Sequence, residues 1–345
     1  RTKLQRQFNT LLQGDEPVTA ELLKNAFLGK TAPNKSLLEL ATYHNQQAAA
    51  LVGADFAAGT IRRFTVSLNK LKAFLKHQHQ RTDWPLEQLN HRFITEFEHF
   101  LKTAHSLDHN SAMNHLKYLK KLTNLALAND WLDKNPFVNY RCKVREVVRE
   151  FLTAEELDAL HQKVFTMPRL AEVRDIFLFA CYTGYAYADV AKLTPQHLLT
   201  GIDGEKWIIT SRSKTDTKSN VPLLPQALAV LARYANDPEC QALGKLLPVK
   251  SNQKLNAYLK EVGDLCGIRK KLTFHIARHT FATTVTLTNG VPIETVSSML
   301  GHKNLRTTQI YAKVVESKVG EDMRRLRDRL NSASESTGTS RKLGS

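Results

Sequence analysis

Three residue types with chemical capability gather near the C-terminal end of the sequence. His275 and Arg278 are three residues apart, His302 follows a glycine, and Tyr311 stands nine residues later. An imidazole can transfer protons, a guanidinium binds anionic oxygens, and a phenol can act as a nucleophile. Each residue by itself is more typical of a packed core or a solvated surface, so the argument depends on their order and spacing.

Short helices are predicted around these residues. An apolar stripe at helical spacing over 274–285 places His275 and Arg278 side by side along its flank. A second amphipathic helix is expected to end at Gly301, so that His302 lies on the following turn. These patterns bring an imidazole and a guanidinium together at the edge of a core.

Further elements upstream complete the predicted domain. Thr183-Gly184 is expected to end an apolar helix, and Thr307 is expected to cap the helix that carries Tyr311. Asp203-Gly204 is a turn signal of a β-hairpin, and Lys214 lies in the polar loop before a third short strand. The predicted strands are 198–202, 207–210 and 221–223.

The composition favours an anionic partner. Among 345 residues, 49 are Lys or Arg and 33 are Asp or Glu, which gives a formal net charge of +16. Nucleic acid is the commonest partner of such a chain. The sequence has neither an apolar run of membrane-spanning length nor paired cysteines, which argues against a membrane protein, a disulfide scaffold and a zinc site of the paired-cysteine kind. We expect a cytoplasmic protein without a cofactor or metal.

The chain is expected to divide into five parts. They are a remnant of an N-terminal domain with its linker at 1–33, a helical domain at 34–140, a basic linker at 141–150, a second domain at 151–330 and a flexible tail at 331–345. Apolar periodicity predicts helices near 19–29, 36–55, 58–77, 86–103 and 109–129. Thr153 and Glu156 form a capping box at the start of the second domain. The candidate phosphate-contacting residues are Arg62, Arg63, Lys70, Lys117, Lys120, Lys121, Lys143 and Arg145.

Taken together, the ordered residues from Thr183-Gly184 to Tyr311 resemble the tyrosine recombinase, or phage integrase, family over almost the whole chain. The resemblance implies a mainly α-helical fold. A helical, SAM-like core-binding domain would precede a mixed α/β catalytic domain, which is mostly helical with a small antiparallel sheet, and the two would form a C-shaped clamp on DNA. The segment 1–33 would then be the end of an arm-binding domain.

The resemblance also implies a role for each residue in cutting and rejoining DNA. Tyr311 would attack the scissile phosphate and form a 3′-phosphotyrosine without ATP. Arg278 and His302 would bind the non-bridging oxygens of the phosphate. Lys214 would protonate the leaving 5′ oxygen, and His275 would assist proton transfer at the tyrosine.

One position departs from the family pattern. Ala186 stands where the family's first catalytic arginine belongs, while Asp189 keeps the usual acidic position. This departure resembles integrases of Bacteroides-type conjugative or mobilisable elements. Arg174, on the apolar helix before the turn, is the candidate substitute, although about 18 Å of helix separates it from the turn.

The expected partner is the double-stranded DNA of attachment sites, with a possible host DNA-bending factor. A charged helix over 314–330 could by itself pack on its own domain, whereas the resemblance implies that it docks on a neighbouring protomer and forms a homotetramer on DNA. The alternatives are a catalytically impaired DNA-binding or architectural protein, a type IB topoisomerase-like enzyme and a chromosome-dimer resolvase. An architectural protein would have no need of all five residues Lys214, His275, Arg278, His302 and Tyr311.

Overall fold

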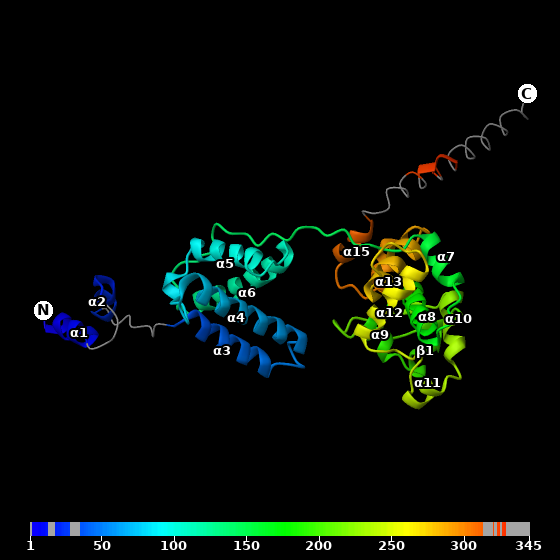
Figure 1. The fold of residues 1–345 in the computed structure, drawn as a ribbon, viewed down its shortest axis with the longest axis horizontal. Helices are drawn as coiled ribbons and strands as arrows, with labels where there is room; N and C mark the ends of the chain where they lie inside the picture. The colour runs from blue at the N-terminus through cyan, green and yellow to red at the C-terminus, as the bar shows by residue number, and fades with distance from the viewer. Residues whose placement is uncertain are drawn as a thin grey trace, which may run out of the picture. The chain divides into compact units, whose positions relative to one another are not determined.

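The computed structural model describes residues 2–12, 18–27, 35–312, 320, 323–324 and 326–328. The chain forms two compact units whose boundary lies between Val147 and Val148, inside the segment predicted as a linker (Figure 1). The predicted helix at 314–330 lies mostly outside the described residues, and the predicted tail at 331–345 lies wholly outside them. None of the described helices is long and apolar enough to cross a membrane.

The regular elements described in the first unit are all helices. The predicted helix near 19–29 is confirmed, and it packs against a preceding helix that the sequence patterns did not predict. The bounds are α1 (Thr2–Leu12), α2 (Ala20–Phe27), α3 (Leu37–Ala50), α4 (Ala58–His79), the 3₁₀ turn η1 (Leu86–Gln88), α5 (His91–Thr103) and α6 (His109–Ala128).

Aromatic side chains hold α4 against α5. Phe74 is fully buried, and its ring centroid lies 5.2 Å from that of Phe93 and 5.2 Å from that of Phe97. Asn90 caps α5 by accepting a hydrogen bond from the N–H of Phe93 at 3.0 Å. The single helix predicted at 86–103 is therefore wrong in its first residues, because this cap starts α5 at His91.

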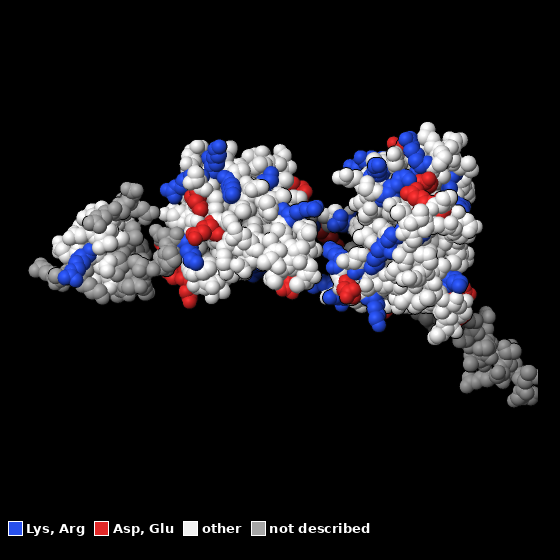
Figure 2. Space-filling model, turned by 90° about the horizontal axis from the view of Figure 1, so that it is seen from below, with Lys and Arg blue, Asp and Glu red and all other residues white. Residues whose placement is uncertain are grey.

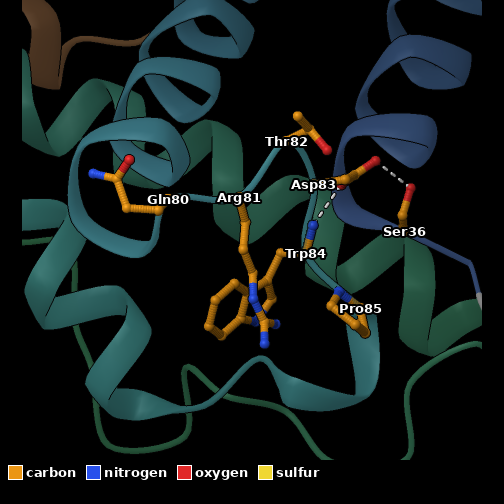
Figure 3. Close-up of a pocket in the computed structure, with 7 residues that line it drawn as sticks. All are labelled: Ser36, Gln80, Arg81, Thr82, Asp83, Trp84 and Pro85. Atoms are coloured by element: carbon orange, nitrogen blue, oxygen red, sulfur yellow. Dashed lines mark hydrogen bonds between the residues drawn. The ribbon is translucent and has the colours of Figure 1, made fainter. Parts of the chain in front are cut away.

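The N-terminus of α3 is fastened to the connection between α4 and η1. The Asp83 carboxylate accepts a hydrogen bond from Ser36 Oγ at 2.6 Å (Figure 3). It also accepts one from the N–H of Leu38 at 3.0 Å. A capping box between Ser36 and Glu39 satisfies further N–H groups of the first turn. The surface pocket beside these contacts is lined by Ser36, Gln80, Arg81, Thr82, Asp83, Trp84 and Pro85.

The second unit is built around α8, which is buried along most of its length because nearly all its positions from Ile176 are apolar. The helices α10, α12 and α13 pack against it (Figure 1). The helical bounds are α7 (Ala154–Gln162), α8 (Pro168–Thr183), α9 (Tyr187–Lys192), η2 (Pro195–His197), α10 (Pro225–Tyr234), α11 (Pro238–Leu243), α12 (Asn252–Leu265), α13 (Phe274–Thr280), the π-helical η3 (Phe281–Leu287), α14 (Ile293–Met299) and α15 (Arg306–Ala312).

The second unit also contains the predicted antiparallel sheet. Its strands are β1 (Leu198–Thr200), β2 (Lys206–Ile208) and β3 (Val221–Pro222), in the order β1-β2-β3. Ile208 pairs with Leu198 on one side and with Val221 on the other. The hairpin turn at Asp203-Gly204 and the capping box at Thr153 are both confirmed. The expectation of a mainly helical chain with a small sheet is therefore correct.

Candidate active site

Arg278 lies at the centre of the candidate site, near the end of α13. Its Nη1 donates to the carbonyl of Gly184 at 2.7 Å, and its Nη2 donates to the carbonyl of Leu300 and to Nε2 of His302, the latter at 3.0 Å. The side chain is buried, and burial followed by the positive charge of Arg212 lowers the pKa of Arg278 to about 10. The guanidinium thus stays charged at neutral pH and has donors in place for an anion.

Two glycines shape the chain around this guanidinium. Gly184 ends α8 at φ +73°, and Gly301 follows α14 at φ +59°, so both predicted helix stops are confirmed. A Cβ atom on Gly184 would lie 2.4 Å from the ring of Phe281, and one on Gly301 would lie 2.8 Å from Cδ of Arg212. Both positions exclude a side chain as well as favouring the left-handed conformation of glycine.

Tyr311 lies on α15 and is buried, with its ring centroid 5.3 Å from that of His279. Burial raises the pKa of Tyr311, while the positive charges of Arg278, Arg212 and Arg149 act in the opposite direction. These cations favour the phenolate, which is the attacking form of a tyrosine nucleophile.

His302 is held between Arg278 and α15. Its Nδ1 lies 2.8 Å from Oγ1 of Thr308, and its Nε2 accepts a hydrogen bond from Arg278. Since an arginine only donates, this Nε2 carries no hydrogen here. Burial, followed by the charges of Arg278 and Arg212, lowers the pKa of His302 to about 4. A hydrogen bond from this nitrogen to a phosphate oxygen would require either the other tautomer or an added proton.

The start of α15 differs from the prediction. The helix begins at Arg306, whose N–H donates to Oδ1 of Asn304 at 2.9 Å. Thr307 therefore lies inside the helix and does not cap it. The prediction was wrong because Asn304 supplies a side-chain acceptor further upstream.

His275 and Lys214 both remain exposed. Lys214 lies in the hairpin loop that the bridge between Ser211 and Lys218 closes, and Asp189 anchors this loop by accepting from the N–H of Ser213 at 2.7 Å. Partial burial lowers the pKa of His275, and the cations that lower it further are Arg278, Arg149, Arg212 and Lys214. The structure thus brings Lys214 into the electrostatic neighbourhood of His275.

Ala186 provides no cation where the family pattern has its first catalytic arginine, and Arg174 does not supply one there. The Arg174 guanidinium donates to the carbonyl of Lys163 at 2.7 Å and to the carboxylate of Asp175 at 2.7 Å. It also lies against the ring of Phe165. These contacts hold the end of α7 against α8, so our substitution hypothesis for Arg174 does not agree with the geometry.

Arg212, which sequence reasoning missed, lies at the site instead. It precedes Lys214 by two residues, and its Nε lies 4.0 Å from Oδ2 of Asp189. Within the described part of the chain this buried Nε has no hydrogen-bond partner. The aliphatic stem covers Gly301, and its charge acts on Arg278, His302 and Tyr311. The sequence signal that could have identified Arg212 was its position in the basic loop that also carries Lys214.

Arg149 is a second cation that sequence reasoning missed. The charge of this exposed residue acts on Tyr311, His275 and His279. The chain just after it is fixed to the second unit, because the N–H of Leu152 donates to Oγ1 of Thr280 at 2.9 Å. The linker therefore contributes positive charge to the site as well as connecting the units.

The candidate DNA-contacting residues of the first unit lie on α4, on α6 and in the linker. Asn110 on α6 exchanges two hydrogen bonds with the backbone of Arg145, at 2.8 and 2.9 Å, which places the linker along the start of this helix. Figure 2 shows Lys and Arg side chains on the surface of each unit. DNA contact by Arg62, Arg63, Lys70, Lys117, Lys120, Lys121, Lys143 and Arg145 stays a prediction.

The described residues contain no group of three or more His, Cys, Asp or Glu side chains that could hold a metal ion. The four cysteines, Cys142, Cys181, Cys240 and Cys266, are free.

Two family models match the chain. The phage integrase family matches residues 150–318, and the phage integrase SAM-like domain matches residues 36–142. The tyrosine recombinase XerC of Pediococcus pentosaceus is 25% identical over 290 residues, which cover 79% of this chain and 93% of that protein. The tyrosine recombinase XerA of Thermococcus onnurineus is 32% identical over 182 residues, which cover 50% of this chain and 61% of that protein.

Solved structures show the same fold. A lambda integrase tetramer bound to a Holliday junction has a TM-score of 0.64 at 17% identity and covers 88% of this chain and 84% of its own. The Tn1549 transposon integrase in complex with transposon right end DNA has a TM-score of 0.65 at 15% identity and covers 85% of this chain and 100% of its own. With both of its units matched by phage integrase models, this chain belongs to the phage integrase family of tyrosine recombinases.

Proposed function

We propose that this site-specific recombinase is the integrase of a mobile genetic element and that it acts through a phosphotyrosine at Tyr311. The observation that supports the proposal most strongly is the convergence on Arg278. Its guanidinium contacts the ends of α8 and α14 and the ring of His302, and its charge acts on Tyr311. Segments far apart in sequence thus place a nucleophile beside buried anion donors.

The proposed cleavage step balances without ATP or a metal. The Tyr311 hydroxyl loses its proton with the assistance of His275, which accepts it; the tyrosine oxygen forms a bond to the scissile phosphorus, and the bond from phosphorus to the 5′ oxygen breaks. Lys214 gives a proton to the leaving 5′ oxygen. Rejoining reverses these steps when a 5′-hydroxyl of another strand attacks the phosphotyrosine.

We propose Arg212 as the cation that fills the place of the missing first arginine. Its charge acts on Arg278 and His302, and its Nε has no hydrogen-bond partner within the described residues. Donors aimed at a phosphate are most valuable in the pentavalent transition state, where negative charge develops. Asp189 would keep Arg212 and Lys214 in place through its hold on the hairpin loop.

DNA attachment sites are the proposed partner of both units, with linker cations contributing phosphate contacts. The proposed assembly is a tetramer on DNA through the segment 314–330, with a host DNA-bending factor as a possible accessory.

The test is covalent capture on DNA. The binding site is first selected from a random duplex pool with Tyr311→Phe, which keeps the protein's cations, and a nicked version of that site is then incubated with the wild type. We expect a denaturant-resistant protein–DNA adduct that Tyr311→Phe does not form. Joining of two unlike sites supports an integrase, whereas joining of identical sites alone supports a resolvase. A wild type that binds the site and forms no adduct overturns the catalytic proposal.

A further inference from the structure

His279 is the best-buried imidazole of the site and has no role in the cleavage step as derived above. Its side chain is 4% exposed, and both of its ring nitrogens lack a hydrogen-bond partner within the described residues. A buried polar group without a partner costs free energy, so a protein that keeps one at its active site invites a functional explanation.

The ring of His279 lies close to both His275 and Tyr311, the base and the nucleophile of the proposed cleavage step. Its centroid is 4.4 Å from that of His275 at an interplanar angle of 83°, and 5.3 Å from that of Tyr311. Burial, followed by the charges of His275, Arg149 and Arg278, lowers the pKa of His279 to about 3. The imidazole is therefore neutral near pH 7 and offers one donor and one acceptor.

Phosphate binding would change the partners of Tyr311. In the DNA-free protein the tyrosine interacts with Arg278, which also donates to two backbone carbonyls and to His302. A scissile phosphate that takes a donor of Arg278 removes this interaction. The ring of His279, whose two nitrogens have no hydrogen-bond partner among the described residues, lies 5.3 Å from the tyrosine ring between centroids and is then available as a new partner.

We propose that His279 is a positioning residue for the nucleophile, holding the hydroxyl of Tyr311 by a hydrogen bond once DNA occupies Arg278. The inference rests on the proposed phosphotyrosine mechanism. In this proposal His279 acts on the attacking nucleophile, whereas Lys214 acts on the leaving 5′ oxygen. The end of α13 thereby contributes three side chains to the site, namely His275, Arg278 and His279.

The test compares His279→Phe, which keeps an aromatic ring without nitrogen, with His279→Gln, which restores a donor and an acceptor. Adduct formation is measured in single turnover at saturating protein on the nicked site. We expect about a tenfold to hundredfold slower cleavage for the Phe variant, unchanged DNA affinity, and recovery of most of the rate with Gln. Thr283→Val is the matched control, because it removes another unpartnered buried polar atom from the adjoining segment, and it should cleave within about twofold of wild type.

A substrate with sulfur in place of the bridging 5′ oxygen separates the two sides of the reaction, since a thiolate leaves without a proton. The Lys214→Ala defect should shrink on this substrate, while the His279→Phe defect should persist. Wild-type speed for His279→Phe, equal slowing by Phe and Gln, or recovery of the Phe variant with sulfur would each overturn the proposal. If thermal unfolding shows that His279→Phe is unfolded, His279→Met is used in its place, because methionine fills the same space without a ring nitrogen. A wild type without adduct would instead refute the mechanism on which the inference rests.

Discussion

Replacing Gly301 by alanine should remove Arg212 from the site without touching its charge. A Cβ atom there would lie 2.8 Å from Cδ and 2.9 Å from Cγ of Arg212, and 3.1 Å from the carbonyl oxygen of Lys218. The arginine stem is the movable neighbour, so its guanidinium has to leave its position. Loss of one preorganised donor at a phosphate costs about 2.7–4 kcal/mol in the transition state, or roughly a hundredfold to thousandfold in cleavage rate.

Backbone strain has to be separated from this effect. Gly301 has φ +59°, so alanine adds about 1–2 kcal/mol of strain there. Gly267 has φ +68°, and a Cβ atom at this position would have nothing within 4 Å, so Gly267→Ala adds similar strain alone. Urea unfolding should show comparable destabilisation of the two variants, while only Gly301→Ala should lose adduct formation. Equal cleavage rates in the two variants would refute the assignment of Arg212.

Three further outcomes follow from the contacts. Arg174→Ala should lower the free energy of unfolding by about 1–3 kcal/mol, because buried acceptors lose their donor, yet cleave within about twofold of wild type; a folded but inactive variant would contradict this. The pKa values of His279, about 3, and of His302, about 4, lie below the unfolded value, so their stability contribution is present above about pH 6.5 and is lost as pH falls. Each can cost up to about 2 kcal/mol by pH 5, less for the partly exposed His302, and His279→Gln should reduce the loss seen in urea unfolding; an unchanged pH dependence would contradict it. Lys117→Ala combined with Lys120→Ala should reduce the slope of log K for DNA against log salt by about 2, and an unchanged slope would exclude phosphate contact by these lysines.

Local spacing was sufficient to predict the parts of the site that depend on neighbouring residues. The three-residue step from His275 to Arg278 and the glycine stop before His302 needed only helix geometry. The role of Arg212 could not be read in this way. Its position depends on how the hairpin loop packs over Gly301, some ninety residues later, and no periodicity encodes that contact.

Arg174 is the opposite case, because it was predicted to lie at the site and does not. Its place on an apolar helix near the departure at Ala186 made it a candidate, but the sequence did not reveal its direction. The carbonyl of Lys163 and the carboxylate of Asp175 satisfy its donors on the far part of α8. Residue type and proximity in sequence were therefore insufficient where tertiary hydrogen bonds decided the side chain's position.

The central claim is that Arg212 neutralises charge on the phosphate that Tyr311 attacks. A scissile methylphosphonate, in which a methyl group replaces one anionic oxygen, tests it directly in single-turnover cleavage. We expect Arg212→Ala to be slower than wild type by about a hundredfold or more on the phosphate, and this gap to close largely on the neutral linkage. A gap of the same size on both linkages would contradict the claim.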